Sequence, residues 1–236
     1  MYAVLGSVGL MNRLEFVAKE LGKLADAENA KAMAAYMKTD MPFFGVKRPD
    51  RDSIFKEMMV RYPVATRREY DKAVKELWEQ PHREEKYFAI GVARKVTAYI
   101  TAPSLPLYRR LIVEGAWWDF VDDVAANLVG RLLLENRARI APVMEDWIDH
   151  RHMWVRRSAL LAHLKHKDAT DEATLFDHCL RRAAENEFFI RKAIGWVLRE
   201  YAKTAPEAVA GFVMANRDSW SGLTFREATK HIEAYL

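Results

Sequence analysis

The sequence has little of the material for disulfides, membrane spans or secretion. Its 236 residues contain one cysteine, Cys179, which excludes an intrachain disulfide and suits a reducing cytoplasm. Its apolar runs fall short of the ~18 residues that a membrane-spanning helix needs. The opening MYAVLGSVGLMNRL lacks the basic start and the long apolar stretch of a secretory signal. We therefore expect a soluble cytoplasmic protein, with residues 1–10 as a possible N-terminal extension.

Signatures of metal, nucleotide and nucleophile sites are missing as well. No GxxxxGK[ST] or GxGxxG stretch is present, so nucleotide cofactors have no support. The pairs His150/His152 and His163/His166 have short spacings, but neither HExxH nor a set of cysteines accompanies them. No nucleophile elbow points to a Ser/His/Asp triad. We expect neither a metal nor a cofactor.

Glycine and proline are sparse, at 10 and 8 residues, and apolar residues recur at intervals of three and four nearly throughout. Alternating strand patterns are absent, so the sequence predicts an all-α protein. Cys179 lies in the helical pattern LFDHCLRRA and is expected to pack rather than react. Seven prolines are expected at helix boundaries: Pro49, Pro63, Pro81, Pro103, Pro106, Pro142 and Pro206.

A repeat runs through this helical pattern. VRRSA, IRKAI and FREAT, at 155–159, 190–194 and 225–229, each combine an apolar residue, an arginine and a second charged residue. Two series of residues keep a spacing of 35: Arg156, Arg191 and Arg226, and in the preceding helices Leu77, Ile112 and Trp147. A period of this length, made of two helices, predicts a solenoid of stacked antiparallel helix pairs. Since the tetratricopeptide pattern is missing, we expect a single HEAT-like repeat domain over 11–236.

The repeat places charged residues in register. Asp122, Arg157 and Lys192 take equivalent positions on successive second helices, roughly 8–10 Å apart. We expect them to form a ladder along one surface of the solenoid, the concave one. A ladder of salt bridges that holds the repeats together is the alternative, and periodicity alone leaves both open.

The stretch AWWDFVDD at 116–123 combines two tryptophans with three carboxylates. If it is helical, Trp118 and Asp122 share one face, while Trp117 and Val121 point to another. We then expect Trp117 to remain in the core. The plain alternative is that both tryptophans are core and the aspartates form a solvated flank. The net charge of +4 makes polyanions plausible partners, although 33 acidic residues argue against a simple basic tail.

Several segments together resemble the AlkD family of bacterial DNA alkylation repair glycosylases. The resemblance covers roughly residues 25–232 and is most specific in the WWDxVD pattern and the IGWVLREYAKT run. It rests on AWWDFVDDV (116–124), MWVRRSALL (153–161), FFIRKAIGWVLREYAKTAPEAV (188–209), MAAYMKTDMPFFGVKRPDR (33–51), ELWEQPHREEKYFAI (76–90) and GLTFREATKHI (222–232).

The resemblance implies a HEAT-like array that wraps duplex DNA in a concave basic groove. It further implies base excision repair by hydrolysis of the N-glycosidic bond of N3- and N7-alkylated purines. We expect the protein to act as a monomer without metal or cofactor. The family's catalytic aspartate falls on Asp122, and its two lesion-flanking tryptophans fall on Trp118 and Trp196. Its DNA-contacting arginine falls on Arg157, an aromatic residue of its early repeats on Tyr36, and a further arginine on Arg199. We expect all three to contact DNA.

Further DNA contacts are suggested by charge. Lys47, Arg48 and Arg51 lie in a proline-containing segment and could contact phosphate, although such a charge run is more often a solvated loop. Lys192 joins them through its place in the ladder. Two other functions remain open: a DNA-structure binder without catalysis on the same scaffold, and a solenoid that binds proteins only.

These residue types suit the implied chemistry. An alkylated purine is a cation that leaves behind an oxocarbenium-like sugar, and aromatic faces attract such charge by about 0.5–2 kcal/mol each. A carboxylate such as Asp122 stabilises the sugar cation and orients water. Arg157 would bind a phosphate bidentately, or else pair with Asp122 when DNA is absent. A neutral lesion would need an acid, and in phase with Asp122 only Glu227 could donate, if its pKa were strongly raised.

Overall fold

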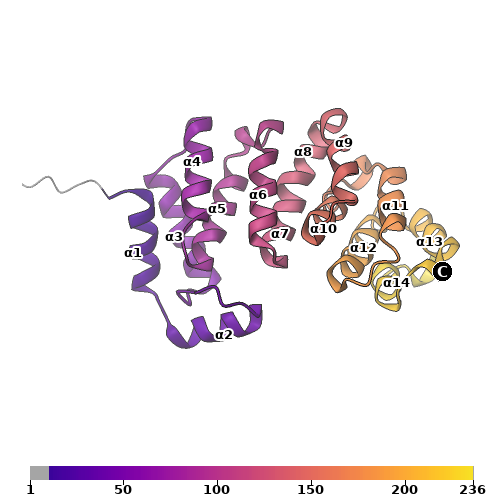
Figure 1. Ribbon diagram of the computed structural model, residues 1–236, viewed down its shortest axis with the longest axis horizontal. Coiled ribbons are helices and arrows are strands. Elements are labelled where there is room, and N and C mark those ends of the chain that lie inside the picture. Colours follow the sequence, from indigo (N-terminus) through magenta and orange to yellow (C-terminus); the bar gives the residue numbers. More distant parts are fainter. Residues whose placement is uncertain (1–10, 236) are drawn as a thin grey trace, which may run out of the picture. The chain divides into compact units, whose positions relative to one another are not determined.

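The computed structural model describes residues 11–235, which form helices joined by loops, without a strand (Figure 1). The all-α prediction is confirmed. The chain divides into two compact units, one up to Tyr99 and one from Ile100 onward. The predicted extension at 1–10 lies outside the described residues, and the expectation of one domain over 11–236 stays a prediction. Within the described residues, no helix is long and apolar enough to cross a membrane.

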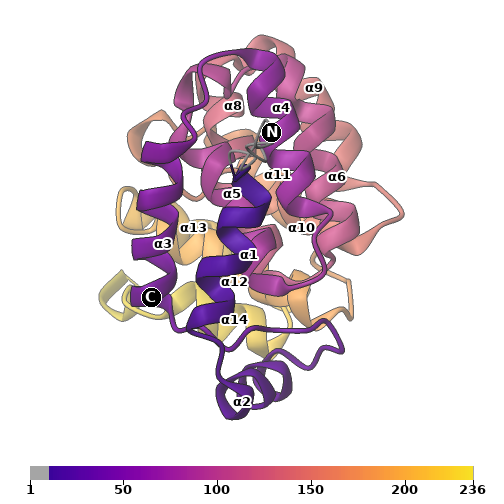
Figure 2. The ribbon, with the colours of Figure 1, turned by 90° about the vertical axis from the view of Figure 1, so that its left-hand side faces the viewer.

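The first unit packs its helices around an apolar centre that includes Phe16, Met58 and Tyr70. Capping boxes at Asn12 and Thr66 start two of these helices. Helix α2 stands out, because Met37 is its single buried residue, and Figure 2 shows it beyond the ends of α1 and α3. The helices are α1 (Arg13–Lys23), α2 (Ala27–Met37), α3 (Arg48–Arg61), α4 (Arg67–Trp78), α5 (Arg83–Lys95) and the short η1 (Thr97–Tyr99).

A buried carboxylate anchors the segment between α2 and α3. Glu84, at the start of α5, accepts hydrogen bonds from the backbone N–H groups of Phe44, Gly45 and Val46 at 3.1, 2.9 and 3.2 Å. Gly45 has a φ of +86°, and a Cβ there would lie 2.1 Å from the carbonyl oxygen of Asp26, so no other residue fits. The anchor thereby fixes both α2 and the basic start of α3.

Glu84→Gln should destabilise the first unit. The amide has one acceptor oxygen, and its NH2 would face backbone donors, so buried N–H groups lose their partner at about 1–3 kcal/mol. Urea unfolding followed by circular dichroism measures the loss. Glu57→Gln is the control, because Glu57 pairs with Arg61 at the surface and should change stability by less than about 0.5 kcal/mol. Equal shifts in both variants would contradict the anchor.

The second unit is a succession of helix pairs. First helices begin at residues 137, 172 and 206, and second helices at 153, 188 and 222, so each step is 35 or 34 residues. The helix-pair repeat is therefore confirmed. Its helices are α6 (Leu105–Gly115), α7 (Trp118–Val124), the π-helical turn η3 (Ala125–Val129), α8 (Gly130–Glu135), α9 (Arg137–Ile148), α10 (Met153–Leu161), α11 (Glu172–Arg181), α12 (Phe188–Tyr201), α13 (Pro206–Ala215) and α14 (Gly222–Thr229). Short 3-10 turns are η2 (Ala102–Ser104), η4 (Lys167–Ala169), η5 (Arg217–Ser219) and η6 (Glu233–Tyr235).

The 35-residue period is visible in buried core residues. Leu77, Ile112 and Trp147 lie in α4, α6 and α9, and all three are buried. Cys179 is buried in α11, and burial raises the pKa of its thiol, as a packing residue requires. The prediction that Pro142 lies at a helix boundary is wrong, since this residue lies inside α9. It removes one hydrogen bond, while the buried apolar side chains of α9 hold the helix against its neighbours.

Candidate active site

The centre of the candidate site is an ion pair between α7 and α10. Arg157 donates to both oxygens of Asp122, from Nε to Oδ1 and from Nη2 to Oδ2, each at 2.8 Å. Its remaining Nη1 donates to the carbonyl oxygen of Phe189 in α12. The Arg157 side chain is 5% exposed and that of Asp122 16%. One guanidinium thus ties together three successive second helices of the second unit.

Local backbone structure sets this geometry. Trp117 is extended and caps α7, so the helix begins at Trp118 and brings Asp122 onto the same face one turn later. A π-helical turn follows at Ala125–Val129, a feature common at functional sites. A Cβ on Gly130 would lie 2.5 Å from the carbonyl oxygen of Ala162, so glycine allows the close approach to the end of α10.

Two opposing effects act on the Asp122 carboxyl. Burial raises its pKa, the hydrogen bonds and charge of Arg157 lower it, and Asp119 and Asp123 nearby raise it, with a net increase. The bidentate pair engages the ionised form, because both oxygens accept an N–H. The arrangement therefore holds a poorly hydrated, oriented negative charge, which is the form that stabilises a nearby cation.

The two candidate tryptophans lie on different helices of the second unit. Trp118 and Trp196 are each half-buried, in α7 and α12. On α12, Trp196 shares a face with Lys192 and Arg199. Both cations pair with Glu227 of α14, Lys192 at 2.8 Å. The ladder predicted from periodicity thus contains internal salt bridges at two steps, Asp122 with Arg157 and Lys192 with Glu227.

The remaining candidates lie in the first unit. Tyr36 on α2 is 75% exposed. Lys47 caps α3, and Arg48 reaches Asp52 at 3.5 Å while remaining largely in solvent. Arg51 differs, because its guanidinium lies 4.3 Å from the ring centre of Tyr87 and burial lowers its pKa. Lys47 and Arg48 are consequently more accessible to a phosphate than Arg51.

Sequence reasoning missed an aromatic cluster beside Arg157. The rings of Trp154 and Phe189 are tilted by 43° with their centres 4.8 Å apart, and Trp117 contacts both, at 6.0 and 5.5 Å. Trp117, expected in the core, is in fact half-buried, since its extended cap position lies at the helix end. Phe188, which contacts Phe189 with ring centres 5.3 Å apart, is 57% exposed. The signal was present, because Trp154 and Phe189 are one 35-residue period apart.

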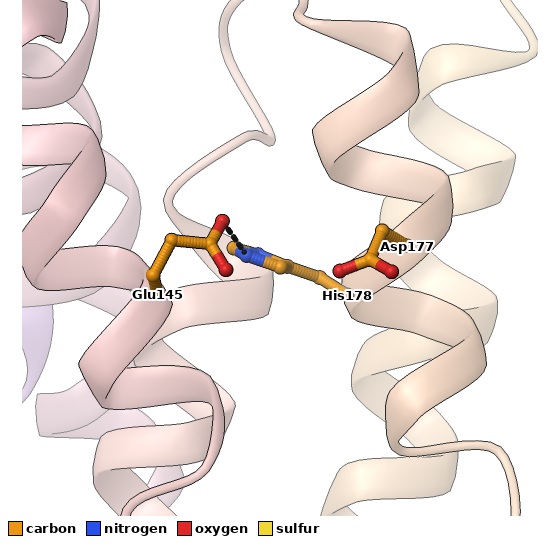
Figure 3. Close-up of side chains that lie close together, drawn as sticks. All are labelled: Glu145, Asp177 and His178. Atoms are coloured by element: carbon orange, nitrogen blue, oxygen red, sulfur yellow. Dashed lines mark hydrogen bonds and ion pairs between the residues drawn. The ribbon is translucent and has the colours of Figure 1, made fainter.

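A set of metal-type ligands occurs elsewhere in the second unit. Within residues 11–235, Glu145, Asp177 and His178 bring one ligand atom each within 4.8 Å of one another (Figure 3). His178 contacts Glu145 at 2.9 Å, and Arg181 contacts Glu145 at 2.6 Å and Asp177 at 3.1 Å. A guanidinium thus already neutralises both carboxylates, so the set is an ion-pair network. None of the four histidines considered in the sequence belongs to it.

Comparison with known proteins agrees with this architecture. A solved structure described as a predicted DNA alkylation repair enzyme from Enterococcus faecalis is 26% identical, with a TM-score of 0.81, and the match covers 89% of this chain and 97% of that one. The crystal structure of AlkD2 from Streptococcus mutans shares the fold, with a TM-score of 0.60 at 13% identity over 86% of this chain and 99% of that one. No curated protein matches the sequence. The family model for DNA alkylation repair enzymes matches residues 17–232, and the chain therefore belongs to that family, as its resemblance to AlkD predicted.

Proposed function

We propose that the protein is a DNA glycosylase of base excision repair, which hydrolyses the N-glycosidic bond of cationic N3- or N7-alkylated purines in duplex DNA. Membership of the family supports DNA alkylation repair as the process. One observation carries the finer proposal: the largely buried Asp122 carboxylate, oriented at both oxygens by Arg157 and one helical turn from Trp118. The protein would act as a cytoplasmic monomer without metal or cofactor.

The proposed chemistry uses the charge of the lesion itself. Alkylation at N3 or N7 makes the purine a cation, so it leaves as a neutral base and the sugar becomes an oxocarbenium-like cation. Asp122 would stabilise that sugar cation and orient the attacking water. The half-buried indoles of Trp118 and Trp196 would offer their faces to the cationic base and sugar. The protein thus mainly has to stabilise positive charge.

DNA contacts would come from cations of both units. Arg157 would bind a backbone phosphate and fix the register on the duplex. Lys192, Arg199, Lys47 and Arg48 would add phosphate contacts, while Arg51 would act chiefly by stacking on its tyrosine. Tyr36, exposed on α2, would contact DNA from the first unit.

Binding of DNA without catalysis is the second candidate. The observation in its favour is that Asp122 and Arg157 satisfy each other, as a purely structural salt bridge would. Release of base from DNA separates the two functions. Salt-sensitive binding to duplex DNA separates both from a solenoid that binds only proteins.

A panel of duplexes, each with one lesion, tests the proposal. Cationic 3- and 7-alkylpurines should be released, and hypoxanthine and uracil should be left essentially untouched, because a neutral base needs a proton donor. Glu227 does not supply one, since the hydrogen bond from Lys192 is the main cause that lowers its pKa. Abasic sites are scored under single-turnover conditions, with chromatography of the released bases. Efficient excision of a neutral base would refute this account of the site. Failure to release a base from any duplex would refute the proposed glycosylase activity.

A further inference from the structure

The two cationic side chains that share a helix face with Trp196 are already paired with a carboxylate of the protein, that of Glu227. Lys192, Trp196 and Arg199 occupy positions i, i+4 and i+7 of α12 and therefore share one face. Glu227 of α14 accepts from Lys192 through Oε1 at 2.8 Å and pairs with Arg199 through Oε2. One carboxylate thus bridges both positive charges on the face that carries a proposed lesion-contacting indole.

Close backbone packing fixes the position of this carboxylate. A Cβ added to Gly195 would lie 2.4 Å from the Cβ of Glu227 and 3.0 Å from the carbonyl oxygen of Thr224, so α12 and α14 nearly touch there. The Thr224 hydroxyl also donates to the carbonyl oxygen of Arg191 at 3.3 Å. The Glu227 side chain is 20% exposed, and its lowered pKa keeps it ionised at neutral pH.

We propose that Glu227 is a counter-anion that restrains DNA binding: it occupies the place between Lys192 and Arg199 that a DNA backbone phosphate would take. This inference rests on the proposed DNA-binding function. Carboxylate and phosphate oxygens bind the same guanidinium and ammonium donors. A phosphate must therefore displace Glu227 or share the cations with it, and either way the free energy of DNA binding becomes less favourable.

The role proposed for Glu227 differs from that of Asp122 in its pair with Arg157. Asp122 also neutralises a cation, but its charge has a use in base release. Glu227 lies three repeat steps along the same register, and the proposed chemistry gives it no task. Because contacts between cations and phosphates supply most of the affinity for undamaged DNA, a built-in anion lowers that affinity. The protein would then leave undamaged and processed duplexes more readily.

Glu227→Gln tests the inference in the full-length protein. Glutamine keeps the volume and one acceptor, but it no longer neutralises the two cations. Affinity for an undamaged duplex should increase severalfold, and the slope of log K against log salt should steepen by about one to two units. Fluorescence anisotropy over a salt series measures both quantities, and circular dichroism melting confirms that the variant is folded.

Glu145→Gln is the matched control. It makes the same change in net charge, and Glu145 also bridges two partners, His178 and Arg181, neither of which is a proposed DNA contact. This variant should match the wild type in slope. In the charge-balanced double variant Lys192→Gln/Glu227→Gln, compared with Lys192→Gln alone, the remaining gain should come through Arg199 only. The comparison of these two variants tests the inference if Glu227→Gln alone melts below the assay temperature.

The outcomes separate this inference from the function on which it rests. Salt-dependent binding by the wild type, with Glu227→Gln no tighter and no steeper than Glu145→Gln, would overturn the role of Glu227 and leave the proposed function standing. Loss of salt-dependent duplex binding in every variant and in the wild type would overturn both. A gain confined to Glu227→Gln supports the counter-anion.

Discussion

Asp122→Asn should lower single-turnover release of a cationic alkylpurine by roughly 10²–10³-fold, the usual scale for one preorganised electrostatic group. The side chain keeps its volume and loses its charge, so the sugar cation loses its stabilising partner. Affinity for duplex DNA should not fall, because removing a negative charge beside Arg157 favours a phosphate there. Near wild-type release would mean that Asp122 is not the stabilising carboxylate.

The structure adds a stability effect to this expectation. Arg157 is 5% exposed and would face an amide, which can accept one of its two hydrogen bonds to this residue. Its bond to the Phe189 carbonyl remains, so the helices should stay packed with a lower melting temperature. Assays therefore belong well below that temperature. Asp123→Asn, the same change one residue along, is the control and should retain activity, since Asp123 accepts a hydrogen bond from Asn127 in the adjoining π-helical turn.

The period of the sequence predicted the fold because each repeat buries one equivalent face. Leu77, Ile112 and Trp147 occupy the core of their helices in turn, and a residue pattern that recurs every helix pair is visible without coordinates. The shared face of Trp118 and Asp122 was equally accessible, because it follows from geometry within one helix turn. The salt bridge between Asp122 and Arg157 was predicted as an alternative to phosphate binding, from spacing alone.

Features that depend on particular close approaches were not predictable in this way. Glu84 binds backbone groups about forty positions away, and nothing in its local pattern marks it. Glu227 reaches both Lys192 and Arg199 because Gly195 lets two helices approach closely, and a period of 35 gives only the first partner. Trp117 is half-buried because α7 begins only at Trp118, so Trp117 caps the helix in an extended conformation and does not lie within it.

Arg157→Ala should change stability, pH dependence and salt dependence together. In the proposed mechanism this side chain binds the Asp122 carboxylate, the Phe189 carbonyl and a DNA phosphate. Removing it leaves the largely buried Asp122 charge without a counter-ion, at about 3 kcal/mol of unfolding free energy. Without the opposing hydrogen bonds, the pKa of Asp122 should rise further above its usual value. Since the proposed mechanism uses the ionised form of Asp122, the acid limb of the pH–rate profile should move to higher pH.

DNA binding by Arg157→Ala should weaken equally for damaged and undamaged duplexes. The slope of log K against log salt should become shallower by roughly one unit, as for one lost phosphate contact. Arg157→Lys should keep most of the slope, because it keeps the charge, but not the full orientation of Asp122, because lysine lacks the planar fork. Its acid limb should therefore lie between those of the wild type and the alanine variant.

Arg156→Ala separates these effects from simple loss of a salt bridge. Arg156 is the neighbouring residue, and it donates to both carboxylate oxygens of Glu185 at 2.9 and 2.8 Å, in a pair that is also largely buried but somewhat more exposed than that of Arg157. Its removal should lower stability while leaving the salt slope and the acid limb in place. If Arg157→Ala behaves in the same way, Arg157 bridges repeats and contacts no phosphate, and its partner Asp122 would then be part of a structural pair. A change in slope and acid limb confined to Arg157 would instead place both side chains where DNA and the sugar cation meet.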